Sequence, residues 1–195
     1  MGTEFTTYFR LGLHHIADLR GYDHILFITA LTAPYRLADW KRLLWLVTAF
    51  TLGHSVTLVL ATLDLVRIAP TIVEPAIAAT IMLTGLATLL SLAGHGEGAE
   101  RRWQAGRYLM AAGFGLIHGL GFSNFLRSLL GDSDGLAVPL FAFNIGLEAG
   151  QLLIVAGVIL VGLGVEPLVP RRYWVGAVSA LVAILGGSML VQRLG

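Results

Sequence analysis

The sequence predicts an all-α membrane protein, a bundle of about six transmembrane helices preceded by a helix at the membrane surface. Of the 195 residues, 56% are hydrophobic and only 13% are charged. A soluble domain carries about a quarter of its residues as charged side chains. The chain also divides into apolar runs of about 20 residues, the length that crosses a bilayer. We therefore expect one integral membrane domain over residues 1–195.

Composition excludes several classes of function. The formal net charge of +1 argues against a nucleic-acid partner. The absence of cysteine excludes disulfides, thiolate metal sites and cysteine nucleophiles. Lys41 is the only lysine and lies outside any Gly-rich sequence, so no Walker-type nucleotide site is expected. Glu4 and Arg10 near the N-terminus, without a cleavage site after a long apolar core, predict that no signal peptide is removed.

Residues 1–20 form the segment predicted at the membrane surface. Within residues 5–16, apolar side chains are interspersed with the polar side chains of Thr6, Arg10 and His14, as in an amphipathic helix. A polar break follows at residues 18–21. The apolar run over residues 22–33 is short for a crossing. Either its helix continues to about Ala38, giving a span over 21–38, which is the favoured alternative, or it enters the membrane with the preceding helix as a broken hairpin.

Five further spans are expected, over about residues 40–63, 70–93, 105–130, 136–164 and 173–191. Trp40 and Trp45 are predicted anchors at the membrane interface. Residues 34–42 connect the first two spans, and the Gly-rich segment 94–102 is the clearest loop. Polar segments at 131–135 and 166–172 separate the last three spans.

The distribution of basic residues favours an orientation with the N-terminus outside. Inner loops then carry eight of the thirteen Lys and Arg residues, namely Arg36, Lys41, Arg42, Arg101, Arg102, Arg107, Arg171 and Arg172. We expect an integral protein of a bacterial inner membrane. In this orientation the ionisable residues of four spans lie at the middle to outer depth of the membrane.

Two short segments suggest an internal repeat. Residues 49–54 (Ala-Phe-Thr-Leu-Gly-His) resemble residues 142–147 (Ala-Phe-Asn-Ile-Gly-Leu). Three spans in each half would form an inverted 3+3 repeat, a common plan in transporters. Chance is the alternative, because Ala, Phe, Leu and Gly are abundant in this chain.

Ionisable residues inside the apolar runs predict a metal site. Glu148 lies in the centre of a long apolar run, where a carboxylate needs a partner. Imidazole and carboxylate groups are ligands for nickel, cobalt and zinc. The histidines and acids of the other spans are therefore expected to gather with Glu148 around one ion. The predicted ligands are His15, Asp23, His24, His54, His118 and Glu148, with Ser55, Asn144 and Gln151 surrounding them.

Each of these residues also has a structural interpretation. Asp23 has the position of a helix cap, and a buried histidine such as His54 is often a hydrogen-bonded packing residue. Gly115 and Gly119 around His118 are typical of a close helix crossing. Asn144 and Gln151 are also suited to hydrogen bonds between helices, and His14 and His15 to contact with lipid headgroups. His95, in the Gly-rich loop, is expected to be solvated and is not included in the site.

Five sequence blocks, in order, resemble a known family. They are Gly12-x-x-His15-Ile, Gly21-Tyr-Asp-His-Ile-Leu-Phe27, Thr48-Ala-Phe-Thr-Leu-Gly-His-Ser55, Phe114-Gly-Leu-Ile-His-Gly-Leu-Gly-Phe122 and Phe143-Asn-Ile-Gly-Leu-Glu-Ala-Gly-Gln151. Together they resemble the HupE/UreJ family of small membrane proteins. The resemblance implies an accessory role in hydrogenase or urease maturation and nickel permease activity. The family's His-Asp-His pattern matches His15, Asp23 and His24, although the spacing between His15 and Asp23 is longer than in the usual form.

Two functions of different classes follow. The first is a permease for a divalent transition-metal ion, Ni²⁺ or one like it, since Mg²⁺ does not need imidazoles and Cu(I) favours Cys and Met. The alternative is an intramembrane zinc-dependent hydrolase that acts on a lipid or peptide, with Glu148 as general base. A structural accessory subunit is a third hypothesis. We expect Ni²⁺ or Zn²⁺ as the ion, and membrane lipids and a homo-oligomer as partners.

Overall fold

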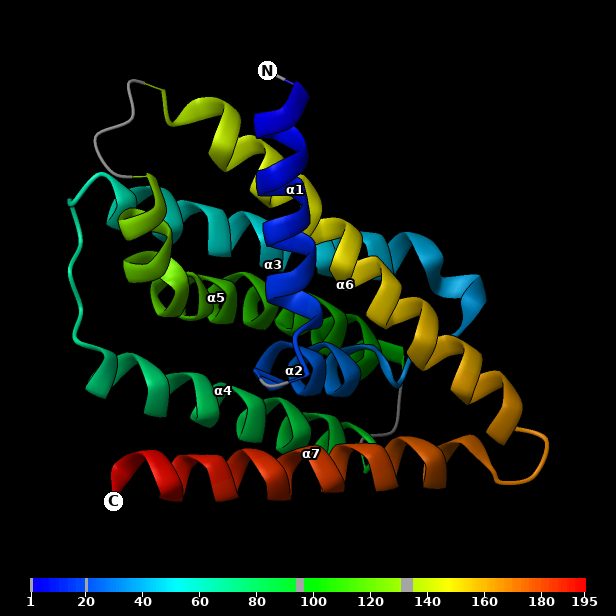
Figure 1. The fold of residues 1–195 in the computed structure, drawn as a ribbon. Helices are drawn as coiled ribbons and strands as arrows, with labels where there is room; N and C mark the ends of the chain where they lie inside the picture. Colours follow the sequence, from blue (N-terminus) through cyan, green and yellow to red (C-terminus); the bar gives the residue numbers. More distant parts are fainter. Residues whose placement is uncertain (1, 20, 94–96, 131–134) are drawn as a thin grey trace.

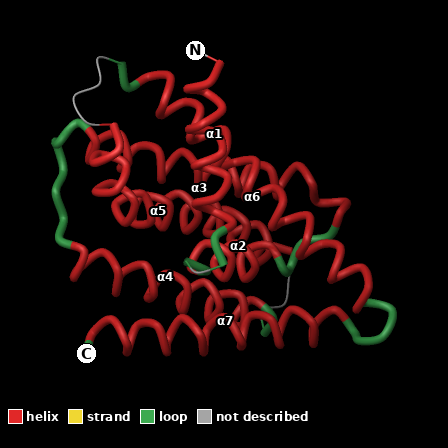
Figure 2. The backbone as a smooth tube through the Cα atoms, in the orientation of Figure 1, coloured by secondary structure: helices red, strands yellow, loops and turns green. Residues whose placement is uncertain are grey.

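The computed structural model describes residues 2–19, 21–93, 97–130 and 135–195, without the side chains of 97–102 and 123–130, and these residues form helices and no strands (Figures 1 and 2). The all-α prediction is confirmed. The helices are α1 (Gly2–Ala17), α2 (Asp23–Thr32), a 3₁₀ turn η1 (Leu37–Asp39), α3 (Trp40–Thr62), α4 (Pro70–Ser91), α5 (Glu97–Leu130), α6 (Ala137–Val165) and α7 (Arg171–Leu194).

Six of these helices form three close pairs: α1 with α6, α3 with α5, and α4 with α7. In Figure 1, α4 and α7 run side by side at the bottom of the view, and α3 and α5 run side by side above them. The short helix α2 contacts α1, α4, α6 and α7 and so lies among the pairs. This arrangement brings the two ends of α2 into contact with residues from most of the bundle.

Glycine lets the backbones of α1 and α6 touch. A Cβ atom at Gly12 would overlap the carbonyl of Phe143, and one at Gly146 would overlap the carbonyl of Phe9. Such close approach is typical of helix pairs in membranes. Helix α1 is therefore packed along α6, and its location at the membrane surface stays a prediction.

The pair of α3 and α5 repeats this pattern. A Cβ atom at Gly53 would overlap the carbonyl of Ala112, and one at Gly115 would overlap the carbonyl of Phe50. On each of these four helices, the glycine comes three residues after the residue whose carbonyl is contacted. An internal repeat would produce such matching contacts, since Phe50 and Gly53 of α3 correspond to Phe143 and Gly146 of α6. The inverted 3+3 repeat itself stays a prediction.

In the part of the chain that the structure describes, four helical segments are long and apolar enough to cross a membrane: Leu37–Thr62, Pro70–Ser91, Ala137–Val165 and Arg171–Leu194. They support an integral membrane protein. Among the other described helices, α2 has only ten residues, whereas α5 has 34 residues and is long enough to cross. The count of six spans, the inner membrane and the outside N-terminus stay predictions.

A continuous helix to about Ala38 was wrong, because α2 ends at Thr32. Pro34 has no N–H group with which to continue the hydrogen-bond ladder. Side chains of other helices instead bind the last carbonyls of α2. The Thr88 hydroxyl donates to the carbonyl of Ala30 over 3.3 Å, and the buried Arg107 guanidinium donates to the carbonyl of Leu31 over 3.0 Å. A ten-residue helix covers about 15 Å, half of a hydrocarbon core, so the broken hairpin stays as the hypothesis for this segment.

The predicted loop over 94–102 was wrong for its second part, since α5 begins at Glu97. Residues 99–102 read Ala-Glu-Arg-Arg, all good helix formers, and they outweigh the glycines around them. His95 and residues 131–134 of the next predicted loop lie outside the described residues.

Candidate metal centre

Three histidines from three helices meet inside the bundle. His15 lies in the last turn of α1, His24 is the second residue of α2, and His54 lies in α3. One ring nitrogen from each lies within 4.8 Å of the others. Two nitrogens bound to one ion at about 2.1 Å are at most about 4.2 Å apart. Small shifts of the rings would therefore bring all three onto a single ion. We call these three residues the histidine group.

Local structure explains why these rings meet. The break between α1 and α2 turns the chain, so that His15 before it and His24 after it face each other with ring centroids 4.8 Å apart. The contact of Gly12 with α6 holds α1 against the bundle. Gly53 draws α3 against α5, beside the fully buried His54, whose ring centroid is 5.8 Å from that of His15.

A fourth histidine adjoins the group. His118 of α5 is 1% exposed, and its ring centroid lies 4.9 Å from that of His24. Its Nε2 atom is 2.9 Å from the hydroxyl of Thr80 on α4. It is not one of the three whose nitrogens share the 4.8 Å limit. His118 therefore lies next to the histidine group, on the side of α4 and α5.

Five ring nitrogens of these histidines are buried without a hydrogen-bond partner among the described residues. They are Nε2 of His15, Nε2 of His24, both ring nitrogens of His54, and Nδ1 of His118. A buried polar group without a partner costs about 1–3 kcal/mol. A neutral imidazole has one nitrogen with a free lone pair, so a divalent ion would accept one lone pair from each ring that binds it and reduce this cost. The residues present thus fit a transition-metal ion by number, by chemistry and by unused bonding capacity.

The two predicted acidic ligands are engaged elsewhere. The Asp23 carboxylate pairs with Arg193 of α7 over 2.9 Å, and the Glu148 carboxylate accepts a hydrogen bond from Thr48 of α3 over 2.7 Å. Within the described part of the chain, neither acid belongs to the histidine group. A ligand role for Asp23 and Glu148 stays a prediction.

The residues predicted to surround the ion bond to each other between α3 and α6. Ser55 donates to Asn144 over 2.5 Å, and Thr51 donates to Gln151 over 2.9 Å. With the Thr48–Glu148 bond, these contacts form a polar row that we call the α3–α6 seam. These contacts correspond to the structural interpretation, hydrogen bonding between helices. A role next to the ion stays a prediction.

Comparison with known proteins gives one match. A family model described as HupE / UreJ protein matches residues 1–193. The chain belongs to the HupE/UreJ family. No curated protein and no solved structure matches it. The resemblance carried by the five sequence blocks is thereby confirmed.

In this HupE/UreJ protein, cavities lie at both ends of α2. The first, of about 280 Å³, is lined at the N-terminal end by residues that include His15, His24, His118 and Arg193. It reaches the histidine group directly. His14, which is exposed, lines a neighbouring groove with His15 and is not part of the group.

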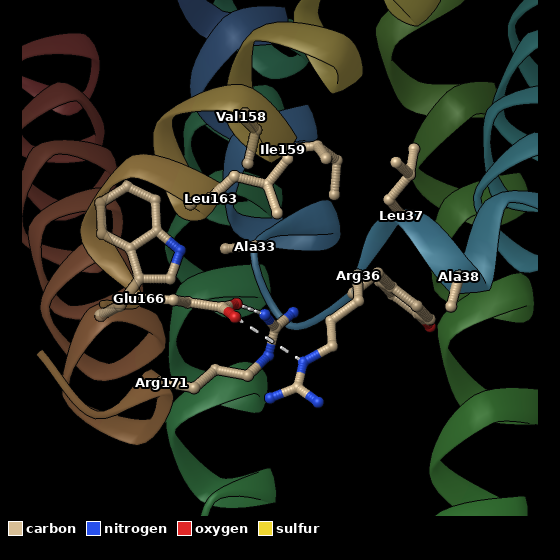
Figure 3. A pocket seen from close by; sticks show the side chains of 12 residues that line it. Ala33, Arg36, Leu37, Ala38, Val158, Ile159, Leu163, Glu166 and Arg171 are labelled. Atoms are coloured by element: carbon tan, nitrogen blue, oxygen red, sulfur yellow. Dashed lines mark ion pairs between the residues drawn. The ribbon is translucent and has the colours of Figure 1, made fainter. Parts of the chain in front are cut away.

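The second cavity, of about 220 Å³, lies at the C-terminal end of α2 and is lined by Ala33 and Tyr35. Figure 3 shows the Glu166 carboxylate at its edge, in ion pairs with both Arg36 and Arg171. These ion pairs join the segment after α2 to the turn between α6 and α7. Helix α2 therefore runs from the histidine group to a separate cavity.

Sequence reasoning missed three residues that shape these sites. Thr80 was one of several hydroxyl residues in an apolar run, and Arg193 stood alone near the C-terminus. Arg107 was counted only as an inner-loop charge, yet it is buried at the end of α2. An arginine inside the first turn of a predicted span was a signal for Arg107. No sequence signal connects Thr80 to His118 or Arg193 to Asp23.

Proposed function

We propose that this protein is a membrane permease for a divalent transition-metal ion, Ni²⁺ or one of similar chemistry, bound by His15, His24 and His54. The observation that carries the proposal is the group of three ring nitrogens within 4.8 Å of one another, with buried nitrogens that lack partners among the described residues. The HupE/UreJ family is associated with nickel and cobalt transport, which supports the same function.

The donor chemistry selects the class of ion. Neutral imidazole suits Ni²⁺, Co²⁺ and Zn²⁺, whereas Mg²⁺ requires oxygen ligands. The chain has no cysteine and only four methionines, so it offers little to Cu(I). A carrier must also release its ion, so its site has to bind the ion weakly enough for it to leave.

The two cavities support a path along α2. The first opens onto the histidine group, and the second lies beyond the far end of the helix. Phe27 stands one turn beyond His24, with its ring centroid 5.0 Å from Phe50 and 6.0 Å from Phe114. These three rings lie between the histidine group and the end of α2. A path along α2 would require these rings to separate.

The hydrolase alternative stays a hypothesis. A general base must reach a water molecule bound to the ion. In the described residues, the Glu148 carboxylate bonds to Thr48 in the α3–α6 seam and is not part of the histidine group. No observation therefore favours hydrolysis over transport.

Uptake of radioactive Ni²⁺ by cells that express the protein tests this proposal. We expect accumulation above that of cells without it, and we expect His54→Ala to remove the increase. His14→Ala is the matched control, because His14 is an exposed histidine on α1 outside the group. Equal uptake by the wild type and the His54→Ala variant would overturn the proposed function.

A further inference from the structure

The hydroxyl of Thr80 lies against the ring of His118 inside the bundle. Thr80 is 3% exposed and His118 is 1% exposed, and the hydroxyl oxygen lies 2.9 Å from Nε2. A hydroxyl has a single proton. Thr80 donates that proton to the carbonyl of Ile77 over 2.7 Å. Its oxygen is therefore left as an acceptor, and the bond to His118 must be donated by the ring.

The other ring nitrogen is then a lone-pair donor. A neutral imidazole carries one proton, so a proton on Nε2 leaves Nδ1 without one. Nδ1 of His118 is buried and has no hydrogen-bond partner among the described residues. The His118 ring adjoins that of His24 and lines the same cavity as His15. The free lone pair thus belongs to a residue beside the histidine group.

We propose that Thr80 is a positioning residue of the metal site, which fixes the proton of His118 on Nε2 and so presents Nδ1 to the ion as a further ligand. The inference deepens the proposed function and rests on it. Ligating histidines usually donate their other N–H group to an acceptor that fixes the tautomer and the ring orientation. Thr80 fills that role here, and Ile77 fixes the direction of its hydroxyl.

Loss of this acceptor has a defined cost. Without it, Nε2–H has no bond, and the ring is free to place its proton on either nitrogen. Removal of such an outer partner typically weakens metal binding 10–100-fold. Thr80→Val keeps the shape of the side chain and removes only the hydroxyl, whereas Thr80→Ser keeps the hydroxyl.

The chain offers a matched control one turn along the same helix. Thr84 is 1% exposed, and its hydroxyl donates to the carbonyl of Thr80 within α4. Thr84→Val therefore removes a buried hydroxyl of the same kind that no histidine contacts in the described structure. It separates an effect on His118 from a general effect of a valine in α4.

The experiment combines Ni²⁺ affinity of the purified protein, by calorimetry, with ¹⁵N NMR of labelled histidines in the metal-free protein. We expect Thr80→Val to weaken Ni²⁺ binding at least about tenfold and to shift the His118 signals away from the Nε2–H form. Thr80→Ser and Thr84→Val should resemble the wild type in both measurements. Unchanged affinity and unchanged tautomer in Thr80→Val, or an equal loss in Thr80→Ser, would overturn the inference.

A second pair of variants covers the case in which Thr80→Val does not fold. The amide oxygen of asparagine lies near the position of Nδ1, and that of glutamine near the position of Nε2. His118→Asn should therefore retain more Ni²⁺ affinity than His118→Gln, and the reverse order would refute the assignment of Nδ1. A wild-type protein that binds no Ni²⁺, Co²⁺ or Zn²⁺ would instead overturn the proposed function, and this result is distinct from a failure of Thr80 alone.

Discussion

The α3–α6 seam and the histidine group, two polar regions of the bundle, differ in how their hydrogen-bonding groups are used. In the α3–α6 seam, three hydroxyl groups of α3 donate to three side chains of α6, and the amide nitrogen of Gln151 is the exception without a partner in the described structure. In the histidine group, both ring nitrogens of His54 lack partners among the described residues. In the described structure, nearly all polar groups of the seam have hydrogen-bond partners, whereas several ring nitrogens of the histidine group have none.

This difference separates stability from function. Hydrogen bonds between membrane helices stabilise a fold by about 0.6–2 kcal/mol each. Buried nitrogens without partners destabilise it, and natural proteins keep such groups where a ligand completes them. We therefore expect substitutions in the seam to change stability and substitutions in the histidine group to change metal binding.

The largest effect is expected for His54→Ala. His54 is fully buried, and in the described structure neither of its ring nitrogens has a hydrogen-bond partner. Its replacement therefore removes a ligand without breaking a described hydrogen bond of the ring. Ni²⁺ affinity should fall by at least about 100-fold, beyond the 10–100-fold typical of residues behind the ligands. Calorimetry on the purified variant measures this change. An affinity within threefold of the wild type would contradict the comparison.

Addition of the ion should stabilise the wild type. A ligand that binds only the folded state at about 100 times its Kd adds about 2.7 kcal/mol to the free energy of unfolding. Ni²⁺ should therefore raise the unfolding temperature of the wild type in detergent and leave that of His54→Ala unchanged. Equal shifts in both proteins would place the ion elsewhere.

A smaller effect, on stability alone, is expected for Thr51→Val. The Thr51 hydroxyl donates to Gln151 over 2.9 Å, and valine has the same shape without the donor. The free energy of unfolding should fall by about 1 kcal/mol, as measured by denaturant titration, while Ni²⁺ affinity stays unchanged. A large loss of affinity would show that the seam belongs to the metal site.

The smallest effect is expected for Glu148→Gln, which keeps an oxygen acceptor for Thr48. Ni²⁺ affinity and uptake should both remain close to those of the wild type. This variant sharpens the comparison, because the sequence predicts Glu148 as a ligand. A loss of Ni²⁺ affinity as large as that of His54→Ala would show that Glu148 is a ligand of the ion.

The sequence predicted which residues lie near this site better than it predicted which residues contact each other. Ionisable residues inside apolar runs pointed to His24 and His54, and the family's His-Asp-His pattern pointed to His15; the structure brings these three together. The direction of a side chain depends on how helices cross, and the sequence does not contain that angle. Glu148 and His54 both lie inside spans, yet one contacts Thr48 and the other lies in the histidine group.

The end of α2 illustrates the same limit for the fold. Pro34 marked a break, but the favoured expectation continued the helix past it. The helix ends earlier because Arg107 and Thr88 bind its last carbonyls. Thr88 lies 58 residues from Ala30 and Arg107 lies 76 residues from Leu31 along the chain, so contacts that form only in the folded bundle act with Pro34 to set where α2 ends.

The central claim is that three histidines from three helices share one ion. Anomalous diffraction at the nickel edge, on crystals grown with Ni²⁺, tests it most directly. We predict a single strong peak within bonding distance, about 2.1 Å, of ring nitrogens of His15, His24 and His54. A peak coordinated by carboxylates away from these rings, or no peak within the bundle, would contradict the account.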